Sequence, residues 1–441
     1  MEWKQLISNK RFGQEHKHAE RHDDRSEFKR DYDRLIFSSA FRRLQNKTQV
    51  FPLPGSIFVH NRLTHSLEVA SVGMSIGNDI SRWVIQKQPD LKDTLVEEIG
   101  TIVSAACLAH DLGNPPFGHS GEKAIQTFFS EGPGLKIKPM VSSEFWDDIT
   151  HFEGNANAFR ILTHRFKGRR QGGFVMTYSM LASIVKYPFA SSLAGNHGKF
   201  GFFASEAESY KKIADELGIS CKSAPGEPLK YARHPLVYMV EAADDICYEI
   251  MDIEDAFRLK ILTEEETKSL LLDFFEGEQR RHVEARLQSV ADLNEQIVYL
   301  RSVAINCLEG ECVRVFVDNE ERILAGDFQG ALIEHISEVP RRAYQRCEQV
   351  SYKKIYCSKH VIDVEMAGFK VITELLDLMT QAVTHSDRAY SRLLINRVSS
   401  QYDILAPTLY GRLMAVLDYI SGMTDVYALD LYRRINGMTC N

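Results

Sequence analysis

Helical periodicity is the feature that most restricts how this chain can fold. Apolar residues recur at three- and four-residue spacing along most of its long segments, which is the period of a buried helix face. Only 13 prolines interrupt the 441 residues, so few positions force a helix to end. Two such faces consist of Val69, Val72, Ile76 and Ile80, and of Ile99, Ile102, Val103, Ala106 and Ala109. The sequence therefore predicts an all-α fold.

Other segments extend this prediction. Residues 367–383 and 409–423 show the same spacing and predict packed helices near the carboxyl end. Gly113 follows the helix that carries Ala109 and is expected to cap it, because glycine readily adopts the left-handed conformation found at helix ends. Segment 188–232 is richer in Gly, Ser and Lys and has weaker periodicity, so we expect a flap or an insertion there.

Composition excludes several classes of protein. A net charge of -7 argues against a protein dedicated to nucleic acid, and 44% hydrophobic with 26% charged residues is typical of a globular chain. The eight cysteines are scattered without a CxxC pair, as in reducing compartments. The first residues are too polar for a secretory signal, and no apolar stretch is long enough to cross a bilayer. We therefore expect a cytoplasmic protein without membrane contact.

Polar chemistry is concentrated in HDLGNPPFGHSGE, residues 110–122, directly after an apolar helix. His65 lies near the start of another predicted helix, so packing of the two helices would bring it to His110 and Asp111. A fourth ligand is expected from residues 234–257, where polar side chains recur at three- and four-residue spacing among aliphatic ones. A buried carboxylate needs a partner, and a divalent cation would supply one. The polar stripe consists of Glu241, Asp244, Tyr248 and Asp252.

These motifs resemble a known family. HNRLTHS, HDLGNPPFGHSGE and EAADDICY, in this order, are similar to motifs of the HD-domain deoxynucleoside triphosphate triphosphohydrolases, the dGTPase family. The resemblance spans nearly the whole chain and implies an HD-domain helical phosphohydrolase fold with additional carboxyl-terminal helices. Further matching segments are FRRLQNKTQVFP (41–52), HFEGNANAFR (151–160), KYP (186–188), VEMAGF (364–369) and SGMTDVYALDLYRR (421–434).

The resemblance also implies roles for individual residues. The metal ligands would be His65, His110, Asp111 and Asp244, with Asp244 a better match than Asp245. His119 would be catalytic, with Glu122 fixing its tautomer. The sugar would meet Gln49, Val50, Tyr248 and Asp252, the phosphates Arg62, Asn155, Lys186 and Tyr187, and the base Glu365. An arginine that a neighbouring subunit contributes in some members would be Arg392 or Arg397, or would be absent.

The expected reaction is metal-dependent hydrolysis of a deoxynucleoside triphosphate, with dGTP favoured, to deoxynucleoside and tripolyphosphate. The metal would be Mn²⁺, Mg²⁺ or another first-row ion. The alternatives are an HD phosphohydrolase for another nucleotide, and a nucleotide- or single-stranded-DNA-binding regulator with a vestigial site. The resemblance further implies a homo-oligomer, a hexamer or tetramer, and regulation by a dNTP or single-stranded DNA is a further expectation. We expect three regions, namely a sugar-reading segment (1–60), a catalytic core (61–260), and a helical region that completes the pocket and the oligomer contacts (261–441).

Overall fold

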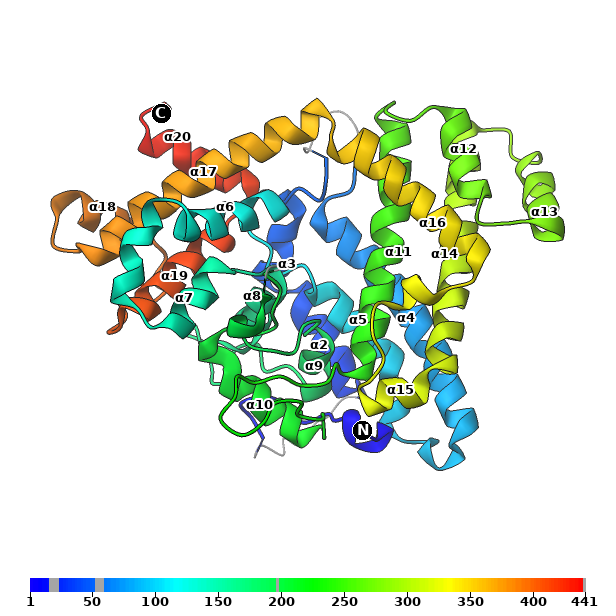
Figure 1. Ribbon diagram of the computed structural model, residues 1–441, viewed down its shortest axis with the longest axis horizontal. Coiled ribbons are helices and arrows are strands. Elements are labelled where there is room, and N and C mark those ends of the chain that lie inside the picture. The colour runs from blue at the N-terminus through cyan, green and yellow to red at the C-terminus, as the bar shows by residue number, and fades with distance from the viewer. Residues whose placement is uncertain (16–23, 52–58, 196–197, 439–441) are drawn as a thin grey trace.

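The computed structural model describes residues 1–15, 24–51, 59–195 and 198–438 of the protein (Figure 1). In these ranges helices are the only extended regular elements, because backbone pairing is limited to isolated bridges. The prediction of an all-α fold is confirmed. None of the described helices combines the length and the apolar character needed to cross a lipid bilayer.

The α-helices, in chain order, are α1 (Trp3–Leu6), α2 (Glu27–Ile36), α3 (Ser39–Arg43), α4 (Arg62–Lys87), α5 (Ile99–Ala109), α6 (Gly118–Ser130), α7 (Ser143–Thr150), α8 (Gly154–Thr163), α9 (Tyr178–Ser183), α10 (Ala207–Glu216), α11 (Pro235–Arg258), α12 (Glu264–Leu272), α13 (Gly277–Leu287), α14 (Leu293–Asp318), α15 (Glu320–Ala325), α16 (Glu338–Val350), α17 (Lys359–Thr384), α18 (Ala389–Arg397), α19 (Leu409–Ser421) and α20 (Asp425–Ile435). The segment η9 (Ser351–Tyr356) is a π-helix, and short 3-10 turns are η1 (Leu44–Asn46), η2 (Pro89–Leu91), η3 (Leu95–Glu98), η4 (Pro133–Met140), η5 (Ser191–Leu193), η7 (Ala204–Glu206) and η8 (Leu332–His335).

Helices α4, α5 and α11 form the centre of a first hydrophobic core. The predicted face of α4 is buried from Val69 to Ile80. α5 is buried on nearly all sides, because α2, α4, α9 and α11 surround it. α4 and α5 approach closely at two glycines, since a Cβ added to Gly77 would lie 2.8 Å from the Gly100 Cα. The two periodic faces read from the sequence are therefore core faces.

A second hydrophobic core lies under α6, α7, α17, α19 and α20. Figure 1 shows these helices at one end of the molecule, with α12 to α14 at the other. α17 and α19 contain the helices predicted for residues 367–383 and 409–423, which are thus confirmed. α8 lies between the cores, since Ala156 packs in the second core and Phe159 in the first.

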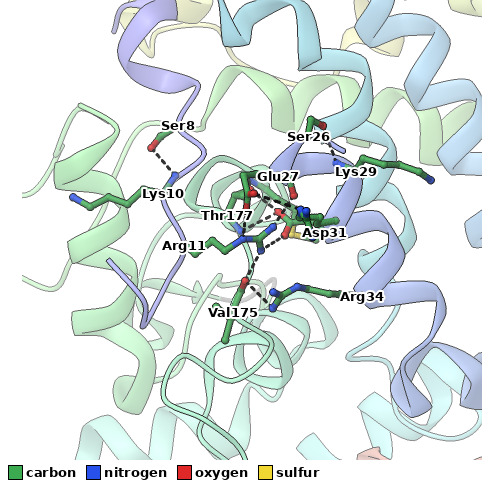
Figure 2. A network of polar contacts seen from close by, with 12 residues as sticks. Ser8, Lys10, Arg11, Ser26, Glu27, Lys29, Asp31, Arg34, Val175 and Thr177 are labelled. Carbon is green, nitrogen blue, oxygen red and sulfur yellow. Dashed lines mark hydrogen bonds and ion pairs between the residues drawn. The ribbon is translucent and has the colours of Figure 1, made fainter. Parts of the chain in front are cut away.

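Arg11 ties the amino-terminal segment to the first core (Figure 2). Its guanidinium group pairs with Glu27 at the start of α2 and donates to Asp31 and to the Val175 carbonyl oxygen, both at 2.6 Å. The buried Asp31 also accepts hydrogen bonds from the N–H group and the hydroxyl group of Thr177. The segment before α2 is therefore held against the loop that precedes α9.

The sequence predicts that Gly113 caps α5, but the structure shows that it does not. The helix ends at Ala109 in a turn, and Gly113 has no left-handed φ angle. A glycine is needed there for close packing, because an added Cβ would lie 2.0 Å from the Gly154 carbonyl oxygen and 2.3 Å from the Ala158 nitrogen. The prediction was wrong because this contact with α8 joins segments far apart in the sequence.

Candidate functional site

The cap of α4 sets the position of His65. The Asn61 side chain accepts hydrogen bonds from the N–H groups of Leu63 and Thr64, both at 3.0 Å, and the Thr64 hydroxyl accepts the Asn61 N–H. Such a capping box orders the first turn of a helix. His65, which is 2% exposed, lies in this turn, and its ring centroid is 5.4 Å from that of His110.

His110 and Asp111 form the turn after α5. The His110 Nδ1 lies 2.6 Å from the Cys107 carbonyl oxygen, which can only accept, so Nδ1 carries the proton. The His110 Nε2 is buried and has no hydrogen-bond partner in the described part of the chain. Asp111 accepts hydrogen bonds from Arg62 at 2.8 Å and from the Asn114 amide. These contacts orient both residues of the turn.

Asp244 on α11 completes the group. Its Oδ1 lies 3.0 Å from the His65 Nε2 and 3.5 Å from the His110 Nε2, which in turn lies 3.6 Å from the Asp111 Oδ1. One ligand atom from each of His65, His110 and Asp111 falls within 4.8 Å of the others. The structure thus brings together all four residues predicted as metal ligands. Asp244, rather than its neighbour Asp245, faces the two histidines.

This donor set fits a divalent cation. Two imidazoles and two carboxylates are ligands that first-row ions accept. The buried His110 Nε2 makes no hydrogen bond to the described residues, and in the neutral imidazole it would present a lone pair toward Asp111 and Asp244. Burial alone would lower the pKa of His110, but Asp111 and Asp244 raise this pKa to about 9. The same negative field would stabilise a cation that replaces the proton.

His119 lies next to the metal group, in a cavity of about 200 Å³. Its helix, α6, begins at Gly118, and both Phe117, with φ 62°, and Gly118, with φ 58°, have positive φ angles. His119 is exposed to solvent in this cavity. The surrounding protein and the positive charges of Arg62 and Lys199 nevertheless lower the pKa of its imidazole. The ring is therefore biased toward the neutral form, which can accept a proton.

Glu122 was expected to fix the tautomer of His119, but its carboxylate is bonded to other groups. Its buried carboxylate accepts hydrogen bonds from the Lys199 ammonium at 3.1 Å and from the Gly154 N–H at 3.0 Å. Lys199 also contacts Glu153 at 3.0 Å. Within the described residues Glu122 makes these two hydrogen bonds and none to the His119 imidazole. Glu122 therefore acts on Lys199 and on the start of α8.

Phosphate-binding candidates lie on one side of the cavity. Asn155, Lys186 and Tyr187 line it as predicted, and Arg62 lines it while it remains paired with Asp111. The Lys186 ammonium group pairs with Glu241 at 3.1 Å, and this carboxylate raises the pKa of Lys186 against the effect of burial. Lys186 is therefore positively charged at neutral pH.

The sequence analysis did not predict three of the residues that line the cavity, namely Asn114, Glu153 and Lys199. Asn114 and Glu153 lie inside motifs that the sequence had already singled out, HDLGNPPFGHSGE and HFEGNANAFR. Lys199 had no such signal, because it lies in the segment 188–232, where periodicity is weak. Its place in the site follows from the ion pairs with Glu122 and Glu153.

Two of the residues predicted to meet a sugar line the cavity. The Gln49 side chain reaches it, and the Gln49 Oε1 is buried without a hydrogen-bond partner in the described part of the chain. The Tyr248 ring also lines it, with its centroid 6.3 Å from that of His65. Pro52, the last residue of the FRRLQNKTQVFP segment, lies outside the described residues.

Three other predicted contact residues do not line the cavity. Val50 packs against the first hydrophobic core. Asp252 is buried one turn beyond Tyr248 and accepts a hydrogen bond from the Tyr356 hydroxyl at 2.8 Å, a partner that the sequence analysis missed. Glu365 is exposed on α17, and its backbone carbonyl accepts a hydrogen bond from the Ser120 hydroxyl on α6 at 2.9 Å. Val50 and Asp252 are thus held by contacts elsewhere in the chain, and Glu365 is exposed to solvent.

Comparisons with known proteins agree with this geometry. Residues 62–171 match the HD domain family, and residues 335–434 match the phosphohydrolase-associated domain. The chain is 38% identical to a deoxyguanosinetriphosphate triphosphohydrolase-like protein of Synechocystis sp., with 100% of both chains covered. It is 36% identical to a protein of the same description from Pseudomonas aeruginosa and 30% identical to the deoxyguanosinetriphosphate triphosphohydrolase of Yersinia enterocolitica, with 99% of each chain covered in both cases.

The first domain match contains α4, α5 with the turn that follows it, and α6, and these carry His65, His110, Asp111 and His119. The second contains α17 to α20, which build the second hydrophobic core beside that site. A buried His–His–Asp group in an HD domain, together with full-length similarity to these enzymes, identifies a phosphohydrolase. The chain belongs to the HD-domain hydrolases of the deoxyguanosinetriphosphate triphosphohydrolase family.

Proposed function

We propose that the chain hydrolyses deoxynucleoside triphosphates, with dGTP preferred, to deoxynucleoside and tripolyphosphate. The observation that carries this proposal is the convergence of the metal-binding group with a cavity lined by Arg62, Lys186 and Lys199. These three cationic side chains can donate hydrogen bonds to phosphate oxygens beside the metal group, as binding of a triphosphate requires. The choice of dGTP rests on the names of the relatives.

His65, His110, Asp111 and Asp244 would hold the divalent ion, Mn²⁺, Mg²⁺ or another first-row ion. When bound, the ion would supply Lewis-acid chemistry to a phosphate oxygen. Arg62, Lys186 and Lys199 would balance the charge of the phosphates, while Asn155 and Tyr187 would donate hydrogen bonds to them. His119, biased toward the neutral form, would take a proton from the attacking water at a ring nitrogen or return one to the leaving oxygen.

Gln49 and Tyr248 support a sugar-binding role at the other side of the cavity. The buried Gln49 Oε1 lacks a hydrogen-bond partner among the residues that the structure describes, so a substrate hydroxyl group that donates to it would remove the cost of leaving it unsatisfied. Tyr248 presents its ring beside His65. Close packing against these two side chains would leave little room for a 2′-hydroxyl group, and we expect discrimination against GTP.

Product analysis tests the proposal. Mn²⁺-loaded protein would be incubated with each of the four dNTPs and with GTP, and the products separated by anion exchange. We expect deoxynucleoside and tripolyphosphate, fastest from dGTP, with GTP spared. The variant His110→Ala should lose the activity, and His282→Ala, which changes an exposed histidine on α13, should retain it.

Other outcomes would replace the proposal. Pyrophosphate and monophosphate would mean cleavage at a different phosphorus, and turnover of another nucleotide alone would favour a different HD phosphohydrolase. Tight dNTP or single-stranded-DNA binding without turnover would favour a regulator with a vestigial site. Assembly into a hexamer or tetramer stays a prediction, which light scattering of the purified protein would check.

A further inference from the structure

Part of the segment 188–232 is a folded unit whose backbone pairs with the chain around it. The Tyr231 N–H donates to the Pro188 carbonyl at 2.8 Å, the Ala190 N–H to Leu229 at 3.0 Å, and the Lys222 N–H to Lys230 at 2.7 Å. Isolated bridges of the same stretches join Phe189 to Lys230 and Cys221 to Tyr231. This pairing places Lys222 and Lys230 beside the end of the segment that carries Lys186 and Tyr187.

These paired stretches line a second cavity, of about 430 Å³, which we call the lysine cavity. Its charged lining residues are Lys186, Lys222, Lys230, Arg233 and Asp327. Lys186 and Tyr187 line both the lysine cavity and the active-site cavity described above. The two cavities therefore share a wall, and that wall is made of two proposed phosphate-binding residues.

The charges in the lysine cavity are not balanced. In the described part of the chain Lys186 and Arg233 share one carboxylate, the buried Glu241, and Arg233 also donates to the Gly330 carbonyl oxygen at 3.3 Å. Lys222 pairs with Asp327 at 3.3 Å. Lys230 is exposed and has no ion-pair partner among the described residues. Four cations thus face two carboxylates, so an anion that enters the cavity meets net positive charge.

The other lining groups restrict the kind of anion. Tyr231, Tyr238 and Phe328 are at most 4% exposed, so these three rings offer almost no free face, whereas Tyr187 and Phe189 are half-buried in the cavity wall. The exposed Lys222 and Lys230 ammonium groups offer several N–H donors on flexible stems, which suits the oxygens of a phosphate chain. The accessible lysine ammonium groups therefore favour the oxygens of a phosphate chain.

We infer that the lysine cavity binds a free inorganic polyphosphate, in the first place the tripolyphosphate that the proposed reaction releases. This inference deepens the proposed function and rests on it for the identity of the anion. Tripolyphosphate held at Lys186 and Tyr187 would pass along the shared wall to Lys222 and Lys230. It would then lie in the lysine cavity while the next substrate occupies the active-site cavity.

The double variant Lys222→Gln/Lys230→Gln isolates the lysine cavity, since neither residue lines the active-site cavity. The matched control Lys4→Gln/Lys92→Gln removes the same charge from two exposed lysines elsewhere. Equilibrium dialysis of the full-length, Mn²⁺-loaded protein against radiolabelled tripolyphosphate, at fixed free Mn²⁺, would measure binding directly. We expect the wild type and the control to fill both cavities, and the double variant to fill only the active-site cavity.

Inhibition of dGTP hydrolysis by added tripolyphosphate provides a second readout. We expect mixed inhibition of the wild type, because tripolyphosphate binds while dGTP is present. In the double variant, the inhibition constant for the component that lowers kcat should rise by about tenfold or more. Competitive inhibition should remain. Purely competitive inhibition of the wild type, or unchanged binding by the double variant, would overturn the inference. So would displacement of tripolyphosphate from the lysine cavity by a nucleoside triphosphate at lower concentration.

These experiments distinguish failure of the proposed function from failure of the inference about the lysine cavity. The dialysis needs no turnover, so a protein that releases other products from dGTP would fail the product analysis whatever the lysine cavity binds. If the double variant then loses one of the two tripolyphosphate sites and keeps the other, the result would still support the lysine cavity as a polyphosphate site. Equal binding by the wild type and the double variant would reject it, even if dGTP hydrolysis proceeds as proposed.

Discussion

His119 combines exposure in the active-site cavity with a lowered pKa. The lowering has two sources, the protein that surrounds the ring and the positive charges of Arg62 and Lys199. Lys199 is in turn held by Glu122 and Glu153, whose carboxylates raise the pKa of Lys199 against the effect of burial. The charge that biases His119 toward the neutral form is therefore itself fixed by two acids.

This arrangement predicts how dGTP hydrolysis depends on pH. A neutral imidazole is the active base, so kcat/KM should fall as the pH drops through the His119 pKa, which lies below the usual value of about 6.5. Lys199→Gln removes a positive charge that lowers this pKa, so the acid limb of the profile should move to higher pH. The exposed Lys136→Gln should leave the limb unchanged. An unshifted limb in Lys199→Gln would contradict the assignment of His119.

At the scale of elements, α20 joins two parts of the site. The carboxylate of Asp425, the first residue of α20, accepts the Thr48 N–H at 2.8 Å and the Phe117 N–H at 2.9 Å. Thr48 precedes the cavity residue Gln49, and Phe117 precedes α6, which carries His119. Asp425 is only 8% exposed, so the hydrogen bond from Thr48 is buried and the one from Phe117 is partly buried.

Asp425→Ala should therefore damage both stability and activity. Two buried N–H groups would lose a charged acceptor, at a cost of about 2–3 kcal/mol in the free energy of unfolding. The kcat/KM for dGTP should also fall, because the supports of Gln49 and His119 move. Asp430→Ala, on the solvent side of the same helix, should change stability by less than about 0.5 kcal/mol. Urea unfolding of both variants would check this, and equal stabilities would reject the role of Asp425.

Substitution of two glycines by alanine should change the stability of the protein in opposite directions. Gly113→Ala would place a Cβ 2.0 Å from a backbone oxygen at the start of α8, so it should cost about 1–3 kcal/mol or more in the free energy of unfolding. Gly310 lies inside α14 with nothing within 4 Å of an added Cβ. Gly310→Ala should therefore stabilise the protein by about 0.5–1 kcal/mol, because alanine favours the helix. Thermal unfolding would compare them, and a neutral Gly113→Ala would refute the close contact.

At the scale of the whole molecule, buried ion pairs link the two hydrophobic cores. The Arg160 guanidinium on α8 donates two hydrogen bonds to Asp418 on α19, both at 2.8 Å, and one to Glu206 at 2.7 Å. All three side chains are at most 4% exposed. The carboxyl-terminal helices are thus attached to the HD domain through charge as well as apolar contact.

Metal binding should stabilise the whole molecule, because its ligands come from α4, the turn after α5 and α11, which meet only in the folded chain. At a free metal concentration about a hundredfold above Kd, the free energy of unfolding should rise by about 2.7 kcal/mol. Thermal unfolding with Mn²⁺ and with excess chelator would measure the shift in Tm. The variant His110→Ala should show no such shift, and a wild-type Tm insensitive to Mn²⁺ would contradict the metal site.

Local patterns in the sequence predicted much of this protein. The helices, the buried faces of α4 and α5, and the nearness of His65, His110, Asp111 and Asp244 followed from periodicity, from motif spacing and from resemblance to the family. These features could be read because helical burial repeats every three or four residues, and because ligands at helix ends lie next to recognisable apolar segments.

Only the tertiary structure decided the partners of individual side chains. Thr48 and Asp425 are 377 residues apart, and Glu122 meets Lys199 from a segment with weak periodicity, so neither contact leaves a local pattern. The same holds for Gly113, whose neighbour is α8, and for the orientation of Val50, Asp252 and Glu365 away from the cavity. Periodicity determines which face of an element is buried, whereas the packing of distant elements determines what that face meets.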